Sequence, residues 1–429
     1  MENDNRYMPE CLKKFVKMYP SMRREARLNI VSGSDSATSN SLIRVQLPTG
    51  GLVDLSTFRL QGTVAIAKSD PNDQTGSLTA CTLAPSHQCI KRFNAIVGGV
   101  NIGSSCNEYG QFAEIYKRAG LSTEWNDSNL LSNQNSVKPT GGSLAGGDGF
   151  REWSYFPNSV CQVNGTGILD TSIVGPSVLE VQFDLDSAVM KFQNATAATV
   201  SISNLQAYCN VIELANGADY ARAQQSLLQG GEIMKMVCPN IQSTNQVNNN
   251  TNLFNVSSQS VDHLVAAGYD NARNGESNQL FQATPIDNAA PEETDAINLT
   301  HFFQMGSNSI PQYGMTNNAY VGEISSANAL GKDSPYNYNQ LFLDANAKNA
   351  VAKLNYLTNN YIIIHDLSLE GRGALHKSRV LTGVPTEAGN SIVRFQTAAH
   401  STTRQTWHLG AVCSGVISVK AGGQVAYEQ

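Results

Sequence analysis

Apolar residues recur at every second position in several segments, and this period of two constrains the fold more than any other feature of the chain. The clearest case is residues 178–185, VLEVQFDL, where four apolar residues alternate with three polar ones. Residues 43–47 and residues 409–419 follow the same rule. Because a strand points successive side chains to opposite faces, each segment is expected to form a strand with one buried and one solvated face. Strands of this kind are typical of an antiparallel β-sandwich.

The composition indicates a neutral, polar surface. Only 15% of the 429 residues are charged, whereas globular proteins average roughly 25%. Such a surface suits a subunit packed among neighbours, although an ordinary β protein of unusual composition would show it as well. The length indicates two domains, each large enough for its own core.

A helical segment separates the two halves of the chain. Residues 218–229, ADYARAQQSLLQ, are rich in Ala and Gln and are followed by two glycines. We therefore expect an N-terminal basic arm or helix over residues 1–35, a first β-sandwich over 36–215, a linker with a helix over 216–250, and a second β-sandwich over 251–429. Residues 125–149 and 305–340 are polar without a regular period, so both are expected to form long loops.

No pattern in the chain indicates catalysis, a cofactor or a bound metal. The eight cysteines are scattered without a CxxC pair, so neither a zinc site nor a disulfide framework is indicated. Cys209 and Cys413 lie within alternating segments and are expected to be small buried hydrophobic residues. His365 and Asp366 are neighbours on an expected strand, where their side chains point to opposite faces and cannot form a direct His-Asp hydrogen bond. His365 is therefore expected to lie in a core, among apolar residues.

Residues 95–116 combine a tight turn with a helical pattern. Gly98 and Gly99 stand between two short apolar segments, and a pair of glycines supplies the positive φ that a two-residue hairpin turn requires. Further along, Tyr109, Phe112 and Tyr116 recur at helical spacing, with a glycine four residues after the last of them. The sequence therefore predicts a hairpin followed by a helix that packs its apolar face inward.

This order of motifs resembles one segment of a known family. IKRFNAIVGGVNIGSSCNEYGQFAEIY is similar to the first-domain segment of the double jelly-roll major capsid proteins, found in large DNA viruses of algae and amoebae, in virophages and, more remotely, in tectiviruses and adenoviruses. The residues that carry the resemblance are Gly98, Gly99, Ile102, Tyr109, Gly110, Phe112 and Ile115. It is close over residues 41–120, and departs from the family pattern at Gly103, at Ser104 and at Phe112, where a tryptophan is common.

The resemblance implies both a fold and a role. The implied fold is all-β, with two consecutive eight-stranded jelly-roll sandwiches (a double jelly roll), long loops and a few short helices. The implied role is that of a major capsid protein in the virion, where homotrimers form pseudo-hexagonal capsomers of an icosahedral shell and contact neighbouring capsomers, penton proteins and minor capsid proteins. No enzymatic activity and no small-molecule substrate are expected.

Two other classes of protein remain open at this point. A glycan-binding β-sandwich adhesin or receptor-binding protein would share the strands and loops, but its groove needs convergent aromatic residues, and the three tryptophans are far apart in sequence. A carbohydrate-active enzyme on a sandwich would need paired carboxylates on one face, and the sequence offers no candidate pair.

The first 30 residues differ in charge from the rest of the chain. They carry seven bases and four acids, so this arm is +3 while the whole chain is −6. A surface helix is the ordinary interpretation. If the chain is a capsid subunit, the arm is expected on the inner face, in contact with an acidic internal membrane, a minor protein or the packaged genome. The bases assigned to it are Lys13, Lys14, Lys17, Arg23, Arg24 and Arg27. The start of the chain is acidic and polar, so we expect no signal peptide.

Overall fold

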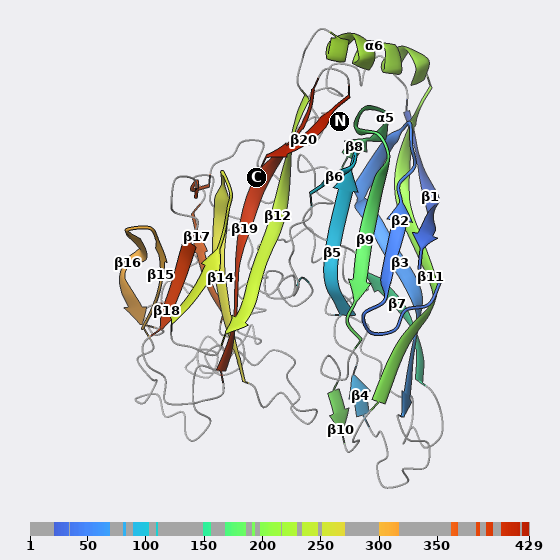
Figure 1. Cartoon of the computed structure of the whole chain (residues 1–429). Coiled ribbons are helices and arrows are strands. Elements are labelled where there is room, and N and C mark those ends of the chain that lie inside the picture. The colour runs from blue at the N-terminus through green and yellow to red at the C-terminus, as the bar shows by residue number, and fades with distance from the viewer. Residues whose placement is uncertain are drawn as a thin grey trace, which may run out of the picture.

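In the computed structural model, the part of the chain that the structure describes consists mostly of β-strands, arranged as two sandwiches side by side (Figure 1). Neither of the helices described below, nor any other helix in the described part of the chain, is long and apolar enough to cross a membrane. The structure describes residues 21–33, 35–68, 80–82, 89–102, 109, 149–155, 168–185, 191–193, 198–215, 217–229, 234–247, 251–270, 300–316, 362–367, 383–386, 392–397, 405–420 and 423–428.

The first sandwich consists of two four-stranded sheets. One sheet has the order β1 (Ser21–Ser32), β11 (Ala198–Leu214), β3 (Leu52–Lys68) and β7 (Gly149–Tyr155). The other has the order β2 (Leu42–Gln46), β9 (Ser177–Phe183), β5 (Ile90–Val97) and β6 (Val100–Asn101). The end of β1 also pairs with β2 and so joins the two sheets. Three short strands lie outside this plan: β8 (Ile168–Asp170), which pairs with β3, and β4 (Ala80–Thr82) and β10 (Lys191–Gln193), which pair with each other.

The second sandwich has the same construction. Its first sheet has the order β12 (Met234–Val247), β19 (Gln405–Val419), β14 (Val261–Asp270) and β17 (Ile362–Asp366), with β20 (Val425–Glu428) added alongside β19. Its second sheet has the order β13 (Thr251–Asn255), β18 (Ile392–Thr397), β15 (Thr300–Met305) and β16 (Asn308–Thr316).

The two sandwiches match strand for strand. Eight strands of the first sandwich each have a counterpart in the second that occupies the same place in its sheet. In chain order the pairs are β1 with β12, β2 with β13, β3 with β14, β5 with β15, β6 with β16, β7 with β17, β9 with β18 and β11 with β19. In both sandwiches the eighth of these strands lies between the first and the third, in the middle of a sheet. This is the jelly-roll order. The expected pair of consecutive eight-stranded jelly rolls is confirmed.

Each core lies between the two sheets of its sandwich, and the alternation in the sequence accounts for it. On β9 the buried residues alternate with partly exposed ones along the whole strand. Phe58 and Phe183 are fully buried in the first sandwich. In the second sandwich the rings of Phe303 and Phe395 lie 4.9 Å apart and are fully buried. Burying one such ring contributes about 2–3 kcal/mol to the free energy of unfolding.

Three of the expected boundaries are wrong. Residues 21–32 form β1, so the proposed arm over residues 1–35 holds at most up to residue 20; Ala26, Leu28 and Ile30 supply the period of two that marks this strand. Residues 234–247 form β12 of the second jelly roll and do not belong to a linker. Residues 308–316, expected in a loop, form β16. The expected helix over residues 218–229 is confirmed as α6 (Gly217–Gln229).

The strand directions give the molecule two distinct ends. At one end lie α6, the start of β1, the β5–β6 turn and α5 (Thr171–Val174). Ser21 pairs with Leu214 at this end, whereas Lys68, where β3 stops, pairs with Ala198 at the other. In the second jelly roll β14 likewise stops at the end away from α6. The connections β3–β5, β6–β7, β14–β15 and β16–β17 therefore join strands at the end opposite α6.

Candidate functional site

The described residues contain no cluster of the kind that carries metal chemistry. No group of three or more His, Cys, Asp and Glu side chains among them is placed to hold a metal ion. The features that stand out are a histidine pair, the Gly98 turn, two buried aspartate clusters and the anchor of α6. Each is built from residues that hold strands together, as the following contacts show.

His365 lies in the core of the second jelly roll, as expected. It is opposite Leu264 in the sheet, while Asp366 is opposite His263, so the two neighbours point to different faces. The His365 ring lies 5.7 Å from the ring of Phe303 and 5.8 Å from that of His301. Burial lowers the pKa of His365 to about 4, and burial together with the charge of His365 lowers the pKa of His301 to about 3. Both rings are neutral at pH 7 and belong to the aromatic core.

Gly98 and Gly99 form the expected two-residue hairpin turn. Val97 pairs with Val100 across the turn, and φ is +57° at Gly98 and +83° at Gly99. The amide of Gly98 donates to the carbonyl of Pro176, 3.2 Å away. Directly after the short strand β6, the Ile102 amide donates to the carbonyl of Ala95 on β5 over 2.8 Å.

The same turn is a contact point between the two jelly rolls. A Cβ placed on Gly98 would lie 2.4 Å from the carbonyl oxygen of Val174 and 2.5 Å from Cγ2 of Val425. Val425 belongs to β20, which pairs with β19 of the second jelly roll. The absence of a side chain at Gly98 therefore allows the second jelly roll to touch the first.

Of the other motif residues, only Ile102 and Tyr109 lie in the described part of the chain. Both are buried, and the ring of Tyr109 lies 5.7 Å from that of Phe93 on β5. Tyr109 thus points inward, as expected. Gly110, Phe112 and Ile115 lie outside the described residues, so the expected helix over residues 109–116 stays a prediction.

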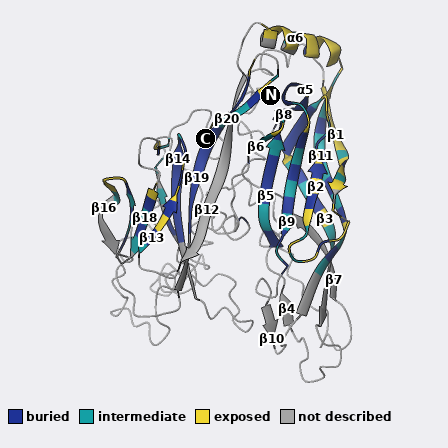
Figure 2. Ribbon diagram, viewed as in Figure 1, coloured by how far each residue is buried: buried dark blue, intermediate teal, exposed yellow. Residues whose placement is uncertain are grey.

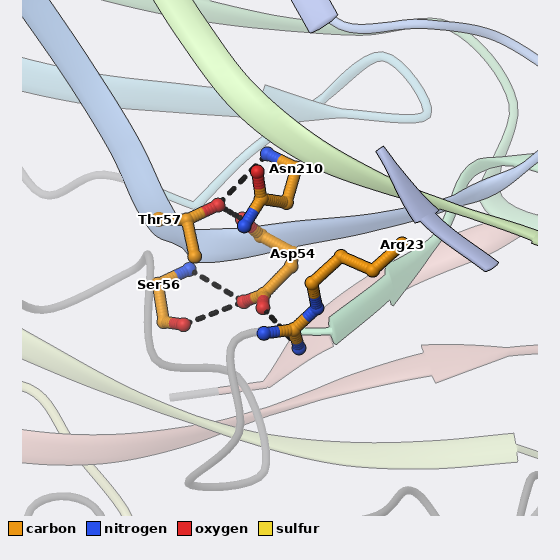
Figure 3. A network of polar contacts seen from close by, with 5 residues as sticks. All are labelled: Arg23, Asp54, Ser56, Thr57 and Asn210. Carbon is orange, nitrogen blue, oxygen red and sulfur yellow. Dashed lines mark hydrogen bonds and ion pairs between the residues drawn. The ribbon is translucent and has the colours of Figure 1, made fainter. Parts of the chain in front are cut away.

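A buried carboxylate, that of Asp54, connects the start of β3 to β1. Asp54 accepts from the amide of Ser56 over 3.2 Å and from its hydroxyl over 2.5 Å, and forms an ion pair of 2.7 Å with Arg23 of β1 (Figure 3). The Thr57 hydroxyl donates to the carbonyl of Asp54 and accepts from the amide of Asn210 on β11. These bonds span a bulge, because β3 has four residues between Asp54 and Arg59 where β11 has one.

The second jelly roll has a similar cluster at the corresponding place. Asp262 is the extra residue of a bulge in β14, between Val261 and His263. It accepts from the hydroxyl of Ser260 over 2.9 Å and from that of Ser414 over 2.5 Å. Each jelly roll therefore places a buried aspartate at a bulge of its third strand, where hydroxyl groups satisfy it.

The two cysteines singled out in the sequence lie on the strands that face these bulges. Cys209 on β11 and Cys413 on β19 are buried, as expected, and their strands correspond in the two jelly rolls. Burial raises the pKa of both thiols to about 12, with Asp54 adding to the shift at Cys209 and Asp262 at Cys413. Both thiols are protonated and unreactive at neutral pH.

Helix α6 is fixed to the first jelly roll by one aromatic residue. Tyr220 is buried against Leu52 and Ile168, and its hydroxyl donates to Asp170 over 2.5 Å. The other oxygen of Asp170 accepts from the amide of Ser172 and so caps α5. Burial raises the pKa of Asp170, an effect that these hydrogen bonds only partly offset.

The basic residues assigned to an N-terminal arm do not lie together. Arg23 and Arg24 are on β1, where Arg23 pairs with Asp54 and Arg24 with Glu213 at 2.6 Å. Arg27 is exposed further along the same strand. The assignment of these three arginines to an N-terminal arm is wrong, because they are part of a paired strand. Lys13, Lys14 and Lys17 lie outside the described residues.

Sequence reasoning missed the four residues that form the clusters: Asp54, Asp170, Tyr220 and Asp262. One signal was available for two of them, since a Val-Asp pair stands near the start of the third strand in both halves, VDLSTF and VDHLVA. Nothing in the sequence linked Tyr220 to Asp170, because 50 residues separate them.

Comparison with known proteins gives a fold and no sequence family. No family model matches the chain, and no curated protein matches it. Among solved structures, the chain is similar to the capsid protein in the quasi-atomic model of the PBCV-1 virus capsid, with a TM-score of 0.58, 9% identity, and coverage of 96% of this chain and 97% of that chain. The Faustovirus major capsid protein matches with a TM-score of 0.55, 9% identity, and coverage of 93% and 90%.

A third similar structure is that of the Sputnik virophage, with a TM-score of 0.51, 12% identity, and coverage of 95% of this chain and 88% of that chain. All three likenesses extend over nearly the whole of both chains. The chain thus has the double jelly-roll fold of these capsid proteins.

Proposed function

We propose that this chain is the major capsid protein of an icosahedral virus and that it resides in the virion. The observation that carries the proposal is the structural match, since the likeness covers at least 93% of this chain and at least 88% of each of the three viral chains. A fold alone does not fix a function. The neutral, polar composition and the identical strand order of the two halves add independent support.

The unit of assembly is a homotrimer. Two jelly rolls of equal topology in one chain give six similar bodies in a ring of three chains, so the capsomer has a nearly hexagonal outline. A heterologous contact that closes after three copies forms such a ring and leaves neither of the two contact faces of any copy unpaired. Capsomers of this shape tile flat facets, while penton and minor capsid proteins complete the shell.

The chain acts through binding surfaces and performs no catalysis. The titratable groups that stand out in the described residues are tied into cores and strand contacts: Asp54 pairs with Arg23, Asp170 accepts from Tyr220, and Asp262 accepts from two serines. The connections at the end opposite α6 face outward in this proposal, and the end with α6 and the start of β1 faces the interior of the shell.

Light scattering coupled to size-exclusion chromatography tests the proposal on the purified chain. The expected result is a particle of three times the 46.2 kDa chain mass that persists on dilution, and electron microscopy should show hexagonal outlines. A monomer at every concentration tested would overturn the proposal. A monomer that binds a glycan array would indicate an adhesin.

A further inference from the structure

The outer faces of the four sheets differ in how far the chain itself covers them. On β5, Asn94 points away from the core of the first jelly roll, opposite Glu180, yet it is only 2% exposed. On β14, His263 points away from the core of the second jelly roll and is 1% exposed. The outer face of β12-β19-β14-β17 is therefore covered in the single chain at β14, whereas that of β2-β9-β5-β6 is covered at β5 and exposed at its edge strand β2, where Leu42 is 41% exposed.

The other two outer faces carry exposed residues on β13, β18 and β1. On β13 and β18, Leu253 is 62% and Ile392 is 52% exposed. On β1, the side chain of Arg23 is 55% exposed, and Glu25 and Arg27 are exposed on the same face. Figure 2 shows exposed residues in yellow on β13 and β18 at one side of the molecule and on β1 at the other.

The sheets that carry Asn94 and His263 are turned toward each other. In Figure 1 the sheet with β5 and the sheet with β12 and β19 lie on the sides where the two jelly rolls approach. The contact of Gly98 with Val425 lies between the same two sheets. The junction within the chain thus joins the β2-β9-β5-β6 sheet of the first jelly roll to the β12-β19-β14-β17 sheet of the second.

The strand correspondence predicts which face of another copy each open face contacts. The open sheet β13-β18-β15-β16 is the counterpart of β2-β9-β5-β6, and the open sheet β1-β11-β3-β7 is the counterpart of β12-β19-β14-β17. The second jelly roll of one copy can therefore meet the first jelly roll of another copy in the same manner as the two meet within the chain. Repetition of one head-to-tail contact is what closes a ring.

The first open face, named here the β13–β15 flank, consists of Leu253, Asn255, Phe302, Ile392 and Arg394. Leu253 is opposite Arg394, so Ile392 is its diagonal neighbour on the same face. The corresponding strand pair of the first jelly roll carries instead the ion pair of Arg44 with Glu180, at 2.7 Å. Leu253 and Ile392 thus form an adjoining pair of exposed apolar side chains on this flank.

The second open face, named here the β1–β3 flank, consists of Arg23, Glu25, Arg27, Arg59 and Tyr208. The Arg59 guanidinium lies 5.2 Å from the centre of the Tyr208 ring and pairs with Glu25. Arginine and tyrosine are enriched in protein interfaces because they offer apolar area together with hydrogen-bonding groups. The stems of these arginines and the Tyr208 ring give Leu253 and Ile392 apolar surface to pack on.

We infer that the β13–β15 flank of one copy packs on the β1–β3 flank of the next copy, which makes this pair of faces the subunit contact of the trimer. The inference rests on the proposed function, since it names the partner face for the self-association proposed above.

The first test places two charges on the apolar flank. In the double variant Leu253→Asp with Ile392→Asp, the buried unpaired charges should raise the trimer's dissociation concentration by about tenfold or more. Leu42→Asp is the matched control, because Leu42 is 41% exposed on β2, the counterpart of β13, and lies outside both flanks. Light scattering gives the mass of each variant, and circular dichroism confirms that each is folded.

The second test does not depend on weakening the assembly. Leu253→Cys and Arg27→Cys are combined in one chain and treated with a short bismaleimide, with each single variant and the wild type as controls for the native cysteines. Covalent trimers should form in the double variant and stay at background in the controls. A wild-type trimer that the aspartates leave intact and the reagent does not link would overturn the inference while the proposed function stands, whereas a monomeric wild type would overturn both.

Discussion

Gly98 is constrained twice, by its backbone and by its neighbours. Its φ of +57° is accessible to other residues at a cost, but a Cβ would also collide with the Val174 carbonyl and with Val425. Gly99 has a φ of +83° and no atom within 4 Å of the position of a Cβ. Both glycines therefore have a positive φ that disfavours other residues, but only at Gly98 would a side chain also collide with neighbouring atoms.

We predict that Gly98→Ala lowers the free energy of unfolding by roughly 2–4 kcal/mol, as the sum of backbone strain and overpacking. Gly99→Ala should lower it by only about 1 kcal/mol, because it carries the backbone cost alone. Urea unfolding of the two variants measures the difference. Equal losses would show that the contact with Val425 contributes nothing.

The histidine pair makes the second jelly roll sensitive to acid. His365 has a pKa of about 4 in the folded chain against 6.5 in the unfolded chain, so the unfolded state binds protons that the folded state excludes. This stabilisation is complete above pH 6.5 and is lost as the pH falls toward 4.

We predict that the free energy of unfolding falls by about 1 kcal/mol per pH unit for each of His301 and His365 over this window. In His365→Gln one of the two contributions disappears, so the slope against pH should be roughly halved. Asp170 acts in the opposite direction, since its pKa is raised in the folded chain, but it is the same in both proteins and cancels in the comparison. Unchanged slopes would contradict the assigned burial of His365.

Among the elements, β1 and α6 show that local sequence alone does not determine secondary structure and that tertiary contacts contribute. The alternation in residues 21–32 is interrupted by charges on both faces near its start, which makes the segment resemble an exposed helix. Pairing decides the matter, because the first part of the strand, up to Leu28, pairs with β11 and the part from Asn29 pairs with β2, so both parts have a partner for their backbone groups. Helix α6 is short and mostly polar, and a helix of 13 residues alone is marginal in water, so it depends on its anchor.

We predict that Tyr220→Ala releases α6 from the first jelly roll. Arg222 has an 80% exposed side chain two residues further on, so trypsin should cut after it at least about tenfold faster in the variant, since local unfolding governs the cleavage rate. Mass spectrometry identifies fragments that end at Arg222. Gln225→Ala, a change at an exposed position of the same helix, should leave the rate as it is; similar rates in all three proteins would refute the anchor.

The whole molecule has one end with α6 and the start of β1, and one end where the long connections leave the strands. In the proposed capsomer β1 starts at the inward end, so we expect Lys13, Lys14 and Lys17 on that side. A basic segment of this kind binds anionic surfaces by electrostatic attraction that weakens with salt.

We predict that deletion of residues 1–20 leaves the trimer mass unchanged, because the subunit contact inferred above uses only strands of the two jelly rolls. Binding to vesicles that contain anionic lipid should fall strongly, and a charge-reversed variant with Lys13, Lys14 and Lys17 each changed to Glu should behave in the same way. Co-sedimentation at low and at high salt measures the binding. Full binding by both variants would show that the arm does not contact membranes.

Much of the fold was predictable from the sequence because the determinants are local. The period of two in residues 43–47 and 178–185 identifies strands with one buried face, Gly98-Gly99 identifies a hairpin, and the composition of residues 218–229 identifies a helix. Each of these features depends on the side chains and backbone angles of neighbouring residues, so no distant contact is needed to read it.

Only the tertiary structure decided which strands pair, which faces stay open and where buried charges are satisfied. Strand β1 joins β11 almost 180 residues later, Asp170 meets Tyr220, and Leu253 is exposed although its alternation alone would fit either face of a sheet. These outcomes depend on contacts between segments far apart in the chain, and the gain in free energy comes from burying surfaces that the two partners create together. The period of a strand fixes that one face is buried, but the rest of the fold determines what covers the other.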